Sequence, residues 1–313
     1  MSKISIAIHG GAGTIDKEDM TPEMEAAYLD GLKAALDAGY SLLEKGEDAV
    51  TVVKIAAMFL EDNILFNAGR GSVFTKTGEH EMDAALMDGA TLNAGAVAGV
   101  KNIRNPIELA AEVMQNSDHV FLSGEGANEF AKKQGVKVEP DEYFFSQFRY
   151  NQWKAISGSD KYALDHSKTD ESKHSKKFGT IGAVACDRNG NIAAATSTGG
   201  MTNKQYGRIG DSPLIGCGTY ANNKTCAISC TGHGEPFIRA VAAYDVSCLM
   251  EYNGLSLYEA MNIVVNEKLI KLAGEGGMIG VDEKGNTALL FNSTGMYRGV
   301  RDSEGLDKVA IYK

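Results

Sequence analysis

The chain has 313 residues, 43% of them hydrophobic, which is enough to bury a sizeable core in one or two domains. Its formal net charge of −10 argues against a nucleic-acid partner, because binding to a phosphate backbone depends on clustered Lys and Arg. No stretch approaches the roughly 18 consecutive apolar residues of a membrane helix, and we expect no secretion signal. Five cysteines without a Cys-x-x-Cys pair predict reduced thiols and a cytoplasmic protein.

The first half of the chain predicts one strand followed mainly by helices. The strand, residues 4–9, ends at a run of glycines, and Thr21 with Pro22 has the residue types of a helix N-cap and first helical position. Apolar residues then recur at helical spacing to Gly39 and slightly beyond. Further helices are predicted at 47–60, 106–114 and 125–133, with a short strand at 119–122.

The second half predicts hairpins with helices between them. Asn189-Gly190 lies between two apolar strands and predicts a two-residue type I′ turn, and Gly285-Asn286 joins a second pair of strands. A strand at 225–229 precedes two long helices, predicted at 236–252 and 256–272. This order favours the α+β class, with antiparallel sheet covered by helices, over a doubly wound parallel fold.

The junction between Gly179 and Thr180 separates two different segments. A polar, charge-dense tract runs from about residue 158 to 177, and a clean strand follows Thr180. A cut before Thr180 would give its hydroxyl an α-amino group as a base, with an unperturbed pKa of roughly 7.7–8.0. Gly179 suits a scissile peptide because it has no Cβ. The simpler alternative is a flexible linker that ends at a strand.

The hairpin brings a second hydroxyl to this junction. With Asn189 and Gly190 at the centre of a two-residue turn, Thr180 faces about Gly199, so Thr198 lies within one residue of it. Strand propensity and turn capping are the ordinary reasons for a Thr/Ser run. Because Thr198 lies beside Thr180, we expect its hydroxyl to be a partner of the Thr180 hydroxyl.

Three further segments carry candidate site residues. Arg208 and Asp211, three apart in a Gly-rich loop, are suited to the carboxylate and ammonium of an amino acid, or form a local salt bridge. The Gly turn at 229–235 exposes N–H groups suited to an oxyanion, although helix capping explains most such turns. Asn67 is the one obvious side-chain amide of the loop at 65–71. His9 is expected to be structural.

Together these segments resemble the plant-type L-asparaginase/isoaspartyl peptidase family, the type III asparaginases, which are threonine-type N-terminal nucleophile (Ntn) hydrolases. The resemblance covers essentially the whole chain. It is carried by the motifs Ile8-His9-Gly10-Gly11-Ala12-Gly13, Phe66-Asn67-Ala68-Gly69, Met82-Asp83-Ala84-Ala85, Gly95-Ala96-Val97-Ala98-Gly99-Val100, Asn105-Pro106, Gly179-Thr180-Ile181-Gly182-Ala183-Val184, Ser197-Thr198-Gly199-Gly200, Gly207-Arg208-Ile209-Gly210-Asp211-Ser212-Pro213 and Thr231-Gly232-His233-Gly234-Glu235.

The resemblance implies a four-layer αββα sandwich and a precursor that cuts itself before Thr180. Residues 1–179 would form an α subunit with a flexible tail at about 158–179, and residues 180–313 a β subunit. The two would remain one fold and pair again as an (αβ)2 assembly. The implied activity is hydrolysis of β-aspartyl (isoaspartyl) dipeptides and L-asparagine, without a cofactor for catalysis.

The resemblance also implies a role for each matching residue. Thr180 would be the nucleophile and Thr198 would orient its Oγ. The Thr231 hydroxyl and the Gly232 N–H would form the oxyanion hole. Arg208 would hold the substrate carboxylate and Asp211 its ammonium, with Gly234 lining that pocket and Asn67 acting near the scissile junction. Backbone carbonyls would hold a structural sodium ion, namely those of Leu60, Glu61, Asn63, Phe66, Ala68 and Arg70.

Other functions remain open at this point. A glycosylasparaginase-like amidase would act on a sugar-linked asparagine, but its relatives are typically secreted or lysosomal. A threonine endopeptidase would need an insertion for a protein substrate, which is not evident. The chain would alternatively be a non-catalytic amino-acid-binding module or an unprocessed, dormant precursor, and these would show one band on a denaturing gel instead of two.

Overall fold

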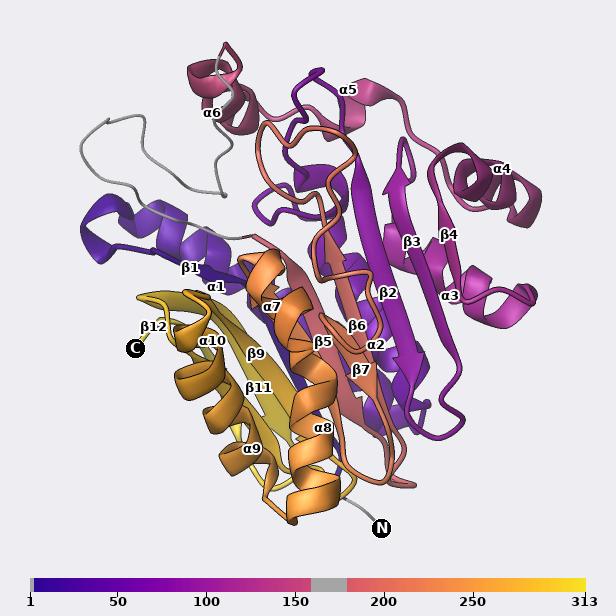
Figure 1. Cartoon of the computed structure of the whole chain (residues 1–313), viewed down its shortest axis with the longest axis vertical. Helices are drawn as coiled ribbons and strands as arrows, with labels where there is room; N and C mark the ends of the chain where they lie inside the picture. Colours follow the sequence, from indigo (N-terminus) through magenta and orange to yellow (C-terminus); the bar gives the residue numbers. More distant parts are fainter. Residues whose placement is uncertain (1–2, 159–178) are drawn as a thin grey trace.

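The computed structural model describes residues 3–158 and 179–313, and contains two β-sheets that pack face to face (Figure 1). The larger sheet has eight strands in the order β12-β11-β1-β5-β6-β2-β3-β4. All its neighbouring strands are antiparallel except β3 and β4. Its strands are β1 (Ser5–Gly13), β2 (Met82–Asp88), β3 (Ala94–Val100), β4 (Phe121–Ser123), β5 (Ile181–Cys186), β6 (Ile192–Thr198), β11 (Gly295–Asp302) and β12 (Asp307–Tyr312).

The smaller sheet has four antiparallel strands in the order β10-β9-β8-β7. They are β7 (Thr219–Ala221), β8 (Cys226–Gly232), β9 (Gly276–Asp282) and β10 (Thr287–Phe291). A core of small and aliphatic residues fills the space between the sheets, including Val184 of β5 and Ile279 of β9. The predicted α+β class with antiparallel sheets is therefore confirmed.

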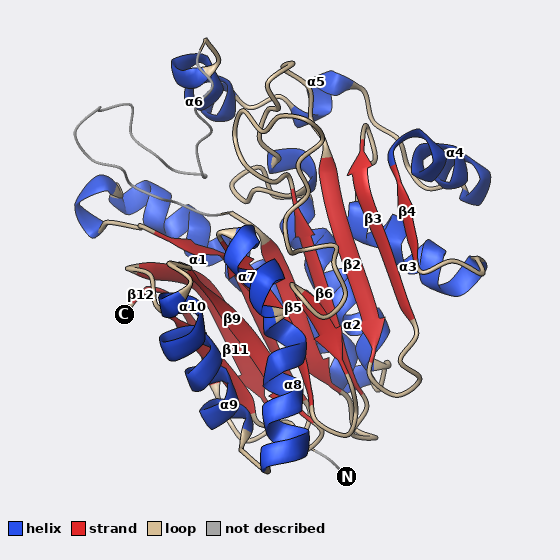
Figure 2. Cartoon of the chain, in the orientation of Figure 1, coloured by secondary structure: helices blue, strands red, loops and turns tan. Residues whose placement is uncertain are grey.

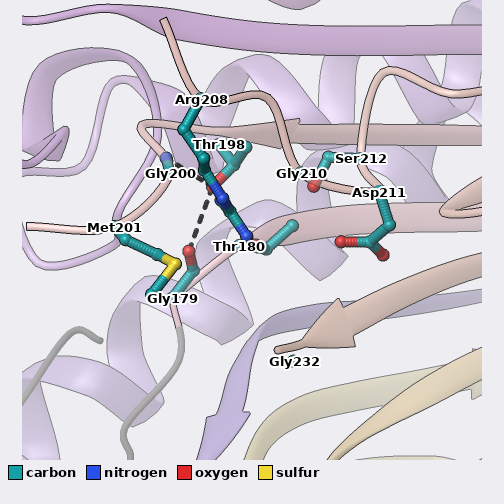
Figure 3. Close-up of a pocket in the computed structure, with 10 residues that line it drawn as sticks. All are labelled: Gly179, Thr180, Thr198, Gly200, Met201, Arg208, Gly210, Asp211, Ser212 and Gly232. Atoms are coloured by element: carbon teal, nitrogen blue, oxygen red, sulfur yellow. Dashed lines mark hydrogen bonds between the residues drawn. The ribbon is translucent and has the colours of Figure 1, made fainter. Parts of the chain in front are cut away.

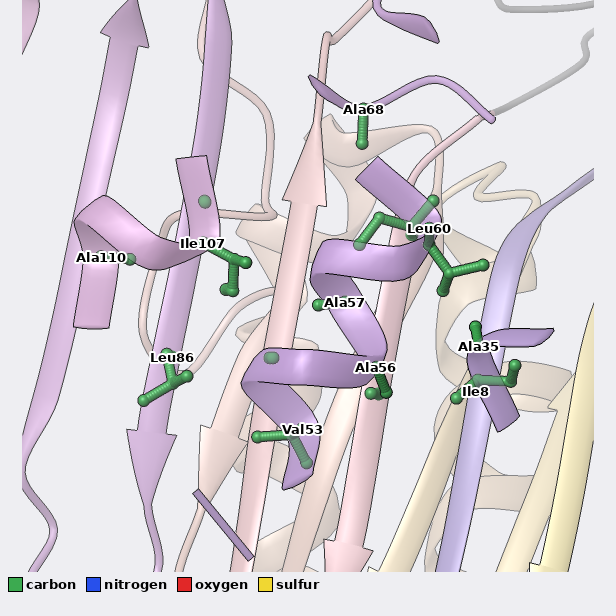
Figure 4. Close-up of a cluster of buried hydrophobic side chains, with 14 of the residues drawn as sticks. Ile8, Ala35, Val53, Ala56, Ala57, Leu60, Ala68, Leu86, Ile107 and Ala110 are labelled. Carbon is green, nitrogen blue, oxygen red and sulfur yellow. The ribbon is translucent and has the colours of Figure 1, made fainter. Parts of the chain in front are cut away.

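Helices cover the outer face of each sheet (Figure 2). On the larger sheet lie α1 (Pro22–Lys45), α2 (Ala49–Glu61) and α3 (Pro106–Asn116), and Figure 4 shows side chains of α2, among them Val53 and Leu60, packed onto the strands. The smaller sheet carries α7 (Gly234–Ala240), α8 (Ala242–Asn253), α9 (Leu257–Ile263), the π-helix η3 (Val264–Lys268) and α10 (Leu269–Lys271). At the β4 end of the larger sheet lies α4 (Gly124–Gln134), whose buried alanines belong to the same core. The remaining helices are α5 (Asp141–Phe144), α6 (Gln147–Ile156) and the short 3-10 helices η1 (Lys17–Asp19) and η2 (Gly69–Gly71).

Both faces of the central strands are buried, so their side chains alternate between two cores. In β5, Ile181, Ala183 and Ala185 pack toward the helices, whereas Val184 and Cys186 face the smaller sheet. The same alternation in β6 sends Ser197 toward the helices and Thr198 toward the space between the sheets. This alternation decides which polar side chains can meet at the candidate site.

Two local predictions about helices had different outcomes. The N-cap at Thr21 is confirmed, because its Oγ1 accepts from the N–H of Met24 and Pro22 begins α1. The single helix predicted at 236–252 is wrong, since Val241 has a φ of 49° and separates α7 from α8. The N–H groups of Ala243 and Tyr244 bond to the carbonyls of Cys217 and Gly216, which satisfies the start of the new helix.

The hairpin predicted at Asn189-Gly190 is confirmed, but the predicted type I′ turn is wrong. Of the central residues only Gly190 has positive φ, and Asp187 pairs with Asn191 across a three-residue loop. The Asp187 Oδ1 accepts from the N–H groups of Asn189 and Asn191, which stabilises the longer loop. The register therefore shifts by one residue, and Ile181 faces Ser197.

Several strands gave no clear signal in the sequence. β2 and β3 are rich in Ala and Gly rather than in β-branched residues, so the sequence does not predict them. It does not predict β11 or β12 either. All five cysteines are free thiols, as predicted, and Cys226 and Cys230 are fully buried core residues. Most of the polar tract before Thr180 lies outside the described residues. No helix in the described part of the chain is long and apolar enough to cross a membrane.

Candidate active site

Thr180 lies at the start of β5 and faces the end of β6, where Thr198 is the last strand residue. The Thr180 Oγ1 donates to the Thr198 Oγ1 at 3.2 Å, and both residues are buried (Figure 3). Continuing the observed register by one step places Thr180 opposite Thr198, not Gly199. The prediction that these hydroxyls are neighbours is therefore confirmed, with the register corrected by one residue.

The carbonyl oxygen of Gly179 accepts two hydrogen bonds. One comes from the Asn67 Nδ2 at 2.9 Å and the other from the Thr198 Oγ1 at 3.1 Å. Since the Thr198 hydroxyl has a single proton, it donates to Gly179 and accepts from the Thr180 hydroxyl and from the Gly200 N–H at 3.0 Å. Two donors thus already point at the oxygen on which negative charge would develop if the Thr180 Oγ attacked this carbonyl.

Asn67 is held firmly in the loop that follows α2. Its Oδ1 accepts from the Val73 N–H at 3.0 Å, and its Nδ2 also donates to the Gly200 carbonyl at 2.7 Å. A Cβ at Gly199 would come within 2.5 Å of the Asn67 Oδ1, so only glycine allows the chain to pass here. The carboxamide therefore has one orientation that satisfies both ends.

Arg208 and Asp211 lie on the loop between β6 and β7 and line the same pocket as Thr180 (Figure 3). Asp211 is 4% exposed, and among the described residues its Oδ2 has no hydrogen-bond partner. Burial raises the pKa of Asp211 to about 7, although the charge of Arg208 opposes this shift. A cationic group entering the site would favour the ionised form.

Arg208 already has a carboxylate partner, which is Glu235 in the first turn of α7. Its Nε and Nη2 donate to the two Glu235 oxygens at 2.9 Å each, and the His233 Nε2 lies 3.0 Å from the Glu235 Oε2. Burial alone would raise the pKa of Glu235, but these hydrogen bonds hold it well below its usual range. The fork to Glu235 fixes the guanidinium and leaves its Nη1 edge beside Gly210.

Gly234 lies against both charged residues. A Cβ there would come within 2.9 Å of the Asp211 Oδ1 and 3.0 Å of the Arg208 Nη2. Because any side chain at position 234 would fill this space, glycine is required for the two opposite charges to remain open to a ligand.

One small pocket collects most of the predicted site residues. Its volume is about 10 Å³, which is room for roughly a single water. Its lining consists of Gly179, Thr180, Thr198, Gly200, Met201, Arg208, Gly210, Asp211, Ser212 and Gly232. Thr231 is fully buried beside it, and its Oγ1 accepts from the Ala12 N–H at 3.2 Å. Asn67, Thr231 and Gly234 therefore border the pocket without lining it.

The loop at 60–72 contains the carbonyls that the resemblance assigns to sodium. Those of Leu60, Asn63, Phe66 and Ala68 each accept one backbone N–H bond within the loop, which leaves a second lone pair on each oxygen. No cluster of three or more His, Cys, Asp or Glu residues suited to a metal occurs among residues 3–158 and 179–313. The donor chemistry fits a hard cation held by carbonyl oxygens rather than a transition metal.

Comparison with known proteins decides the family. A family model described as asparaginase matches residues 2–311. The chain belongs to the asparaginase family. It is 54% identical to the isoaspartyl peptidase of Salmonella typhimurium, over 100% of both chains, and 53% identical to that of Escherichia coli, over 100% of this chain and 97% of the relative. The isoaspartyl peptidase/L-asparaginase of Homo sapiens is 40% identical over 95% of this chain and 92% of its own.

Some residues at the site of this asparaginase-family chain could not be predicted from the sequence. Glu235 lies 27 residues from Arg208, and no pattern in the sequence indicates that the two side chains pair. Arg149 is 1% exposed and donates to the carbonyls of Gly71 and Leu65, bracketing the loop that holds Asn67. A charged residue on an apparently exposed helix gives no sequence signal for such a contact.

Proposed function

We propose that this chain is an isoaspartyl peptidase and L-asparaginase that matures by cutting itself between Gly179 and Thr180. The observation that carries the proposal is the Gly179 carbonyl, which accepts from Asn67 and Thr198 next to the hydroxyl of Thr180. The names of the full-length relatives support the substrate class. The products would be an α subunit of residues 1–179 and a β subunit of residues 180–313 within one αββα Ntn-hydrolase fold.

The first reaction is the attack of the Thr180 Oγ on the Gly179 carbonyl carbon. A C–O bond forms, and the carbonyl oxygen takes negative charge that the Asn67 amide and the Thr198 hydroxyl stabilise. The Thr180 hydroxyl proton is directed toward the Thr198 Oγ by their hydrogen bond. When the C–N bond breaks, its nitrogen takes up the proton that the Thr180 hydroxyl has lost and becomes the free α-amine of Thr180, and water then hydrolyses the ester.

The second reaction uses the same hydroxyl on a substrate. The α-amine, with an ordinary pKa of roughly 7.7–8.0, accepts the Thr180 hydroxyl proton as the Oγ attacks the β-carbonyl carbon of the substrate. The leaving ammonia or amino acid is protonated as the C–N bond breaks, and water hydrolyses the β-aspartyl ester. We assign the oxyanion donors of this reaction to the Thr231 hydroxyl and the Gly232 N–H.

Arg208 and Asp211, which we call the clamp, would bind the aspartyl end of the substrate. Asp211 is buried with an oxygen that has no partner among the described residues, which suits an α-ammonium, and the Nη1 edge of Arg208, which the fork to Glu235 does not use, suits an α-carboxylate. A fixed headgroup places the β-carbonyl near Thr180 while the leaving group varies. This explains why one site would accept both asparagine and isoaspartyl dipeptides.

The pocket volume supports a precursor that is closed to substrate. About 10 Å³ holds no amino acid, and Gly179 is part of its wall. Release of the Gly179 end from Thr180 would enlarge the pocket at the nucleophile itself. Hydrolysis is therefore expected only after the first reaction.

Three further parts of the proposal rest on the family. The loop carbonyls of Leu60, Glu61, Asn63, Phe66, Ala68 and Arg70 would hold a sodium ion, which would stiffen the loop that carries Asn67. The matured protein would pair as (αβ)2 and work in the cytoplasm. No cofactor takes part in either reaction as proposed.

A direct test compares the wild type with Thr180→Ala and Thr180→Ser. The wild type should give two fragments on a denaturing gel, and mass spectrometry should find the smaller one beginning at Thr180. Thr180→Ala should remain one inactive chain, whereas Thr180→Ser keeps a hydroxyl and should be cut more slowly. Cleavage or hydrolysis of an isoaspartyl dipeptide by Thr180→Ala would overturn the proposal.

A further inference from the structure

A buried histidine holds the backbone of Thr180. The His9 Nδ1 lies 3.0 Å from the Thr180 carbonyl oxygen, and because a carbonyl only accepts, the Nδ1 must carry the proton and donate. The His9 Nε2 then accepts from the Ser229 hydroxyl at 2.9 Å. His9 is fully buried, and this burial lowers its pKa to about 3, so the ring is neutral.

The contacts continue from Ser229 to the loop that carries the clamp. The Ser229 Oγ lies 2.7 Å from the Thr196 Oγ1, which in turn lies 2.7 Å from the Thr219 Oγ1. Because Ser229 donates to His9, Thr196 donates to Ser229, and the single Thr219 proton goes either to the Thr196 Oγ1 or to the Ser212 carbonyl oxygen at 2.9 Å. Ser212 directly follows Asp211, so close polar contacts lead from the nucleophile to the ammonium site. We call His9, Ser229, Thr196 and Thr219 the His9 relay.

Gly182 provides the space in which this relay crosses between the sheets. A Cβ at position 182 would come 2.0 Å from the Ser229 Oγ and 2.5 Å from the His9 Nε2. Gly182 does not have a positive φ, so this close approach is the reason for a glycine here. A side chain at this position would separate His9 from Ser229.

The relay is a polar path in a layer whose core is mainly apolar. Its members come from β1, β6, β7 and β8, and all four side chains are fully buried between the two sheets. Buried polar groups are costly unless each one is satisfied, and a satisfied network fixes one arrangement of the groups it joins. The sheet core would need no such path for packing alone.

We propose that the His9 relay is a positioning device for the nucleophile. Once the bond to Gly179 is cut, Thr180 becomes a chain end and loses its upstream anchor, and chain ends fray unless something holds them. The His9 bond to the Thr180 carbonyl then keeps the Oγ and the new amine aimed into the pocket. The contacts of Thr219 with Thr196 and with the Ser212 carbonyl hold the relay against the loop that carries Asp211. This inference rests on the proposed function.

The experiment breaks the relay without touching Thr180. Ser229→Ala and Thr219→Val each remove one buried hydroxyl of the relay, and Thr225→Val is the matched control, because its hydroxyl bonds only locally and to Ser247, remote from the site. We expect Ser229→Ala to lower kcat at least ten-fold with little change in KM, and Thr219→Val to lower it less. Thr225→Val should lose similar thermal stability and keep kcat.

A conservative exchange at His9 separates positioning from packing. In His9→Asn the amide can still donate to the Thr180 carbonyl, whereas His9→Leu fills the space without a donor. Partial rescue of kcat in His9→Asn relative to His9→Leu is expected. Equal losses in both, or a kcat in Ser229→Ala that matches Thr225→Val, would overturn the proposal.

A readout without turnover separates this inference from the proposed function. In cut chains, amide hydrogen exchange at Ile181 should be faster in Ser229→Ala than in Thr225→Val, whether or not the cut wild type hydrolyses a substrate. A cut wild type that hydrolyses neither substrate but shows this exchange pattern would refute the proposed hydrolysis and support the relay. Unchanged exchange at Ile181 would refute the relay.

Discussion

The two sides of the pocket around Thr180 differ in how completely their polar groups are satisfied. On the Gly179 side, Asn67 and Thr198 donate to the Gly179 carbonyl and have all their other contacts in place. On the clamp side, Asp211 is buried with one oxygen that has no partner among the described residues, and Arg208 is held by Glu235. Under the proposed function, the uncut chain is thus assembled for its first reaction, while the second requires a ligand that supplies both an ammonium and a carboxylate.

This difference has an energetic meaning. A buried carboxylate without a partner destabilises the folded chain, whereas a satisfied hydrogen-bond cluster does not. The clamp side therefore lowers the stability of the folded chain but leaves Asp211 available to bind a ligand. Substitutions on the Gly179 side should act on self-cleavage, and substitutions on the clamp side should act on substrate binding and leave self-cleavage intact.

The largest effect is expected for Thr198→Val, which keeps the shape of the side chain and removes its hydroxyl. Self-cleavage should slow by about 100- to 1,000-fold, the usual loss when one oxyanion donor is removed. Thr202→Val is the control, because Thr202 is buried nearby and its hydroxyl has no partner among the described residues. The fraction of cut chain over time on a denaturing gel measures the effect. Equal cleavage rates in the two variants would remove Thr198 from the first reaction.

Arg208→Ala should leave self-cleavage near the wild-type rate and raise KM for an isoaspartyl dipeptide by about 100-fold, as expected for the loss of a charge-assisted contact to the substrate carboxylate. Arg208→Lys should recover only part of this, because an ammonium cannot make the planar fork to Glu235. Steady-state kinetics on fully cut protein tests both. A slow-cutting Arg208→Ala would show that the two sides are not independent.

Binding of L-aspartate should strengthen as pH rises through about 7, because Asp211 must be ionised to hold the α-ammonium and burial raises its pKa to about 7. Calorimetric Kd values between pH 5.5 and 8.5 measure this. Asp211→Asn should bind weakly, with little pH dependence in this range. A Kd independent of pH in the wild type would mean that Asp211 is already ionised when the pocket is empty.

The same shift predicts a stability change of known sign. A carboxyl whose pKa is higher in the folded chain stabilises that state below its unfolded pKa of about 4, and this contribution is lost as pH rises through about 7. Asp211→Asn should therefore be more stable than the wild type at pH 8, by about 1–3 kcal/mol, and no more stable at pH 4. Thermal unfolding at the two pH values checks the sign.

Contacts between residues close in the sequence could be predicted, whereas contacts between distant segments could not. The neighbourhood of Thr180 and Thr198 could be predicted because one short hairpin connects them, and the register error of one residue came from an Asp187 side chain that stabilises a longer loop. The pairing of Arg208 with Glu235 could not be predicted, because it depends on how a loop and a helix pack. The His9 contacts depend on the pairing of β1 with the distant β5 and on two sheets facing each other, which no local pattern encodes.

The smallest effect is expected for Glu235→Gln, where two consequences oppose each other. Loss of the carboxylate loosens the orientation of Arg208, but it also removes a negative charge beside the site for the substrate carboxylate. The Glu235 side chain is 46% exposed, so solvent screens its charge and the loss of orientation should prevail. KM should rise by about two- to five-fold with self-cleavage unchanged. A KM below that of the wild type would show instead that repulsion dominates, and that Glu235 holds the empty clamp at a cost to substrate affinity.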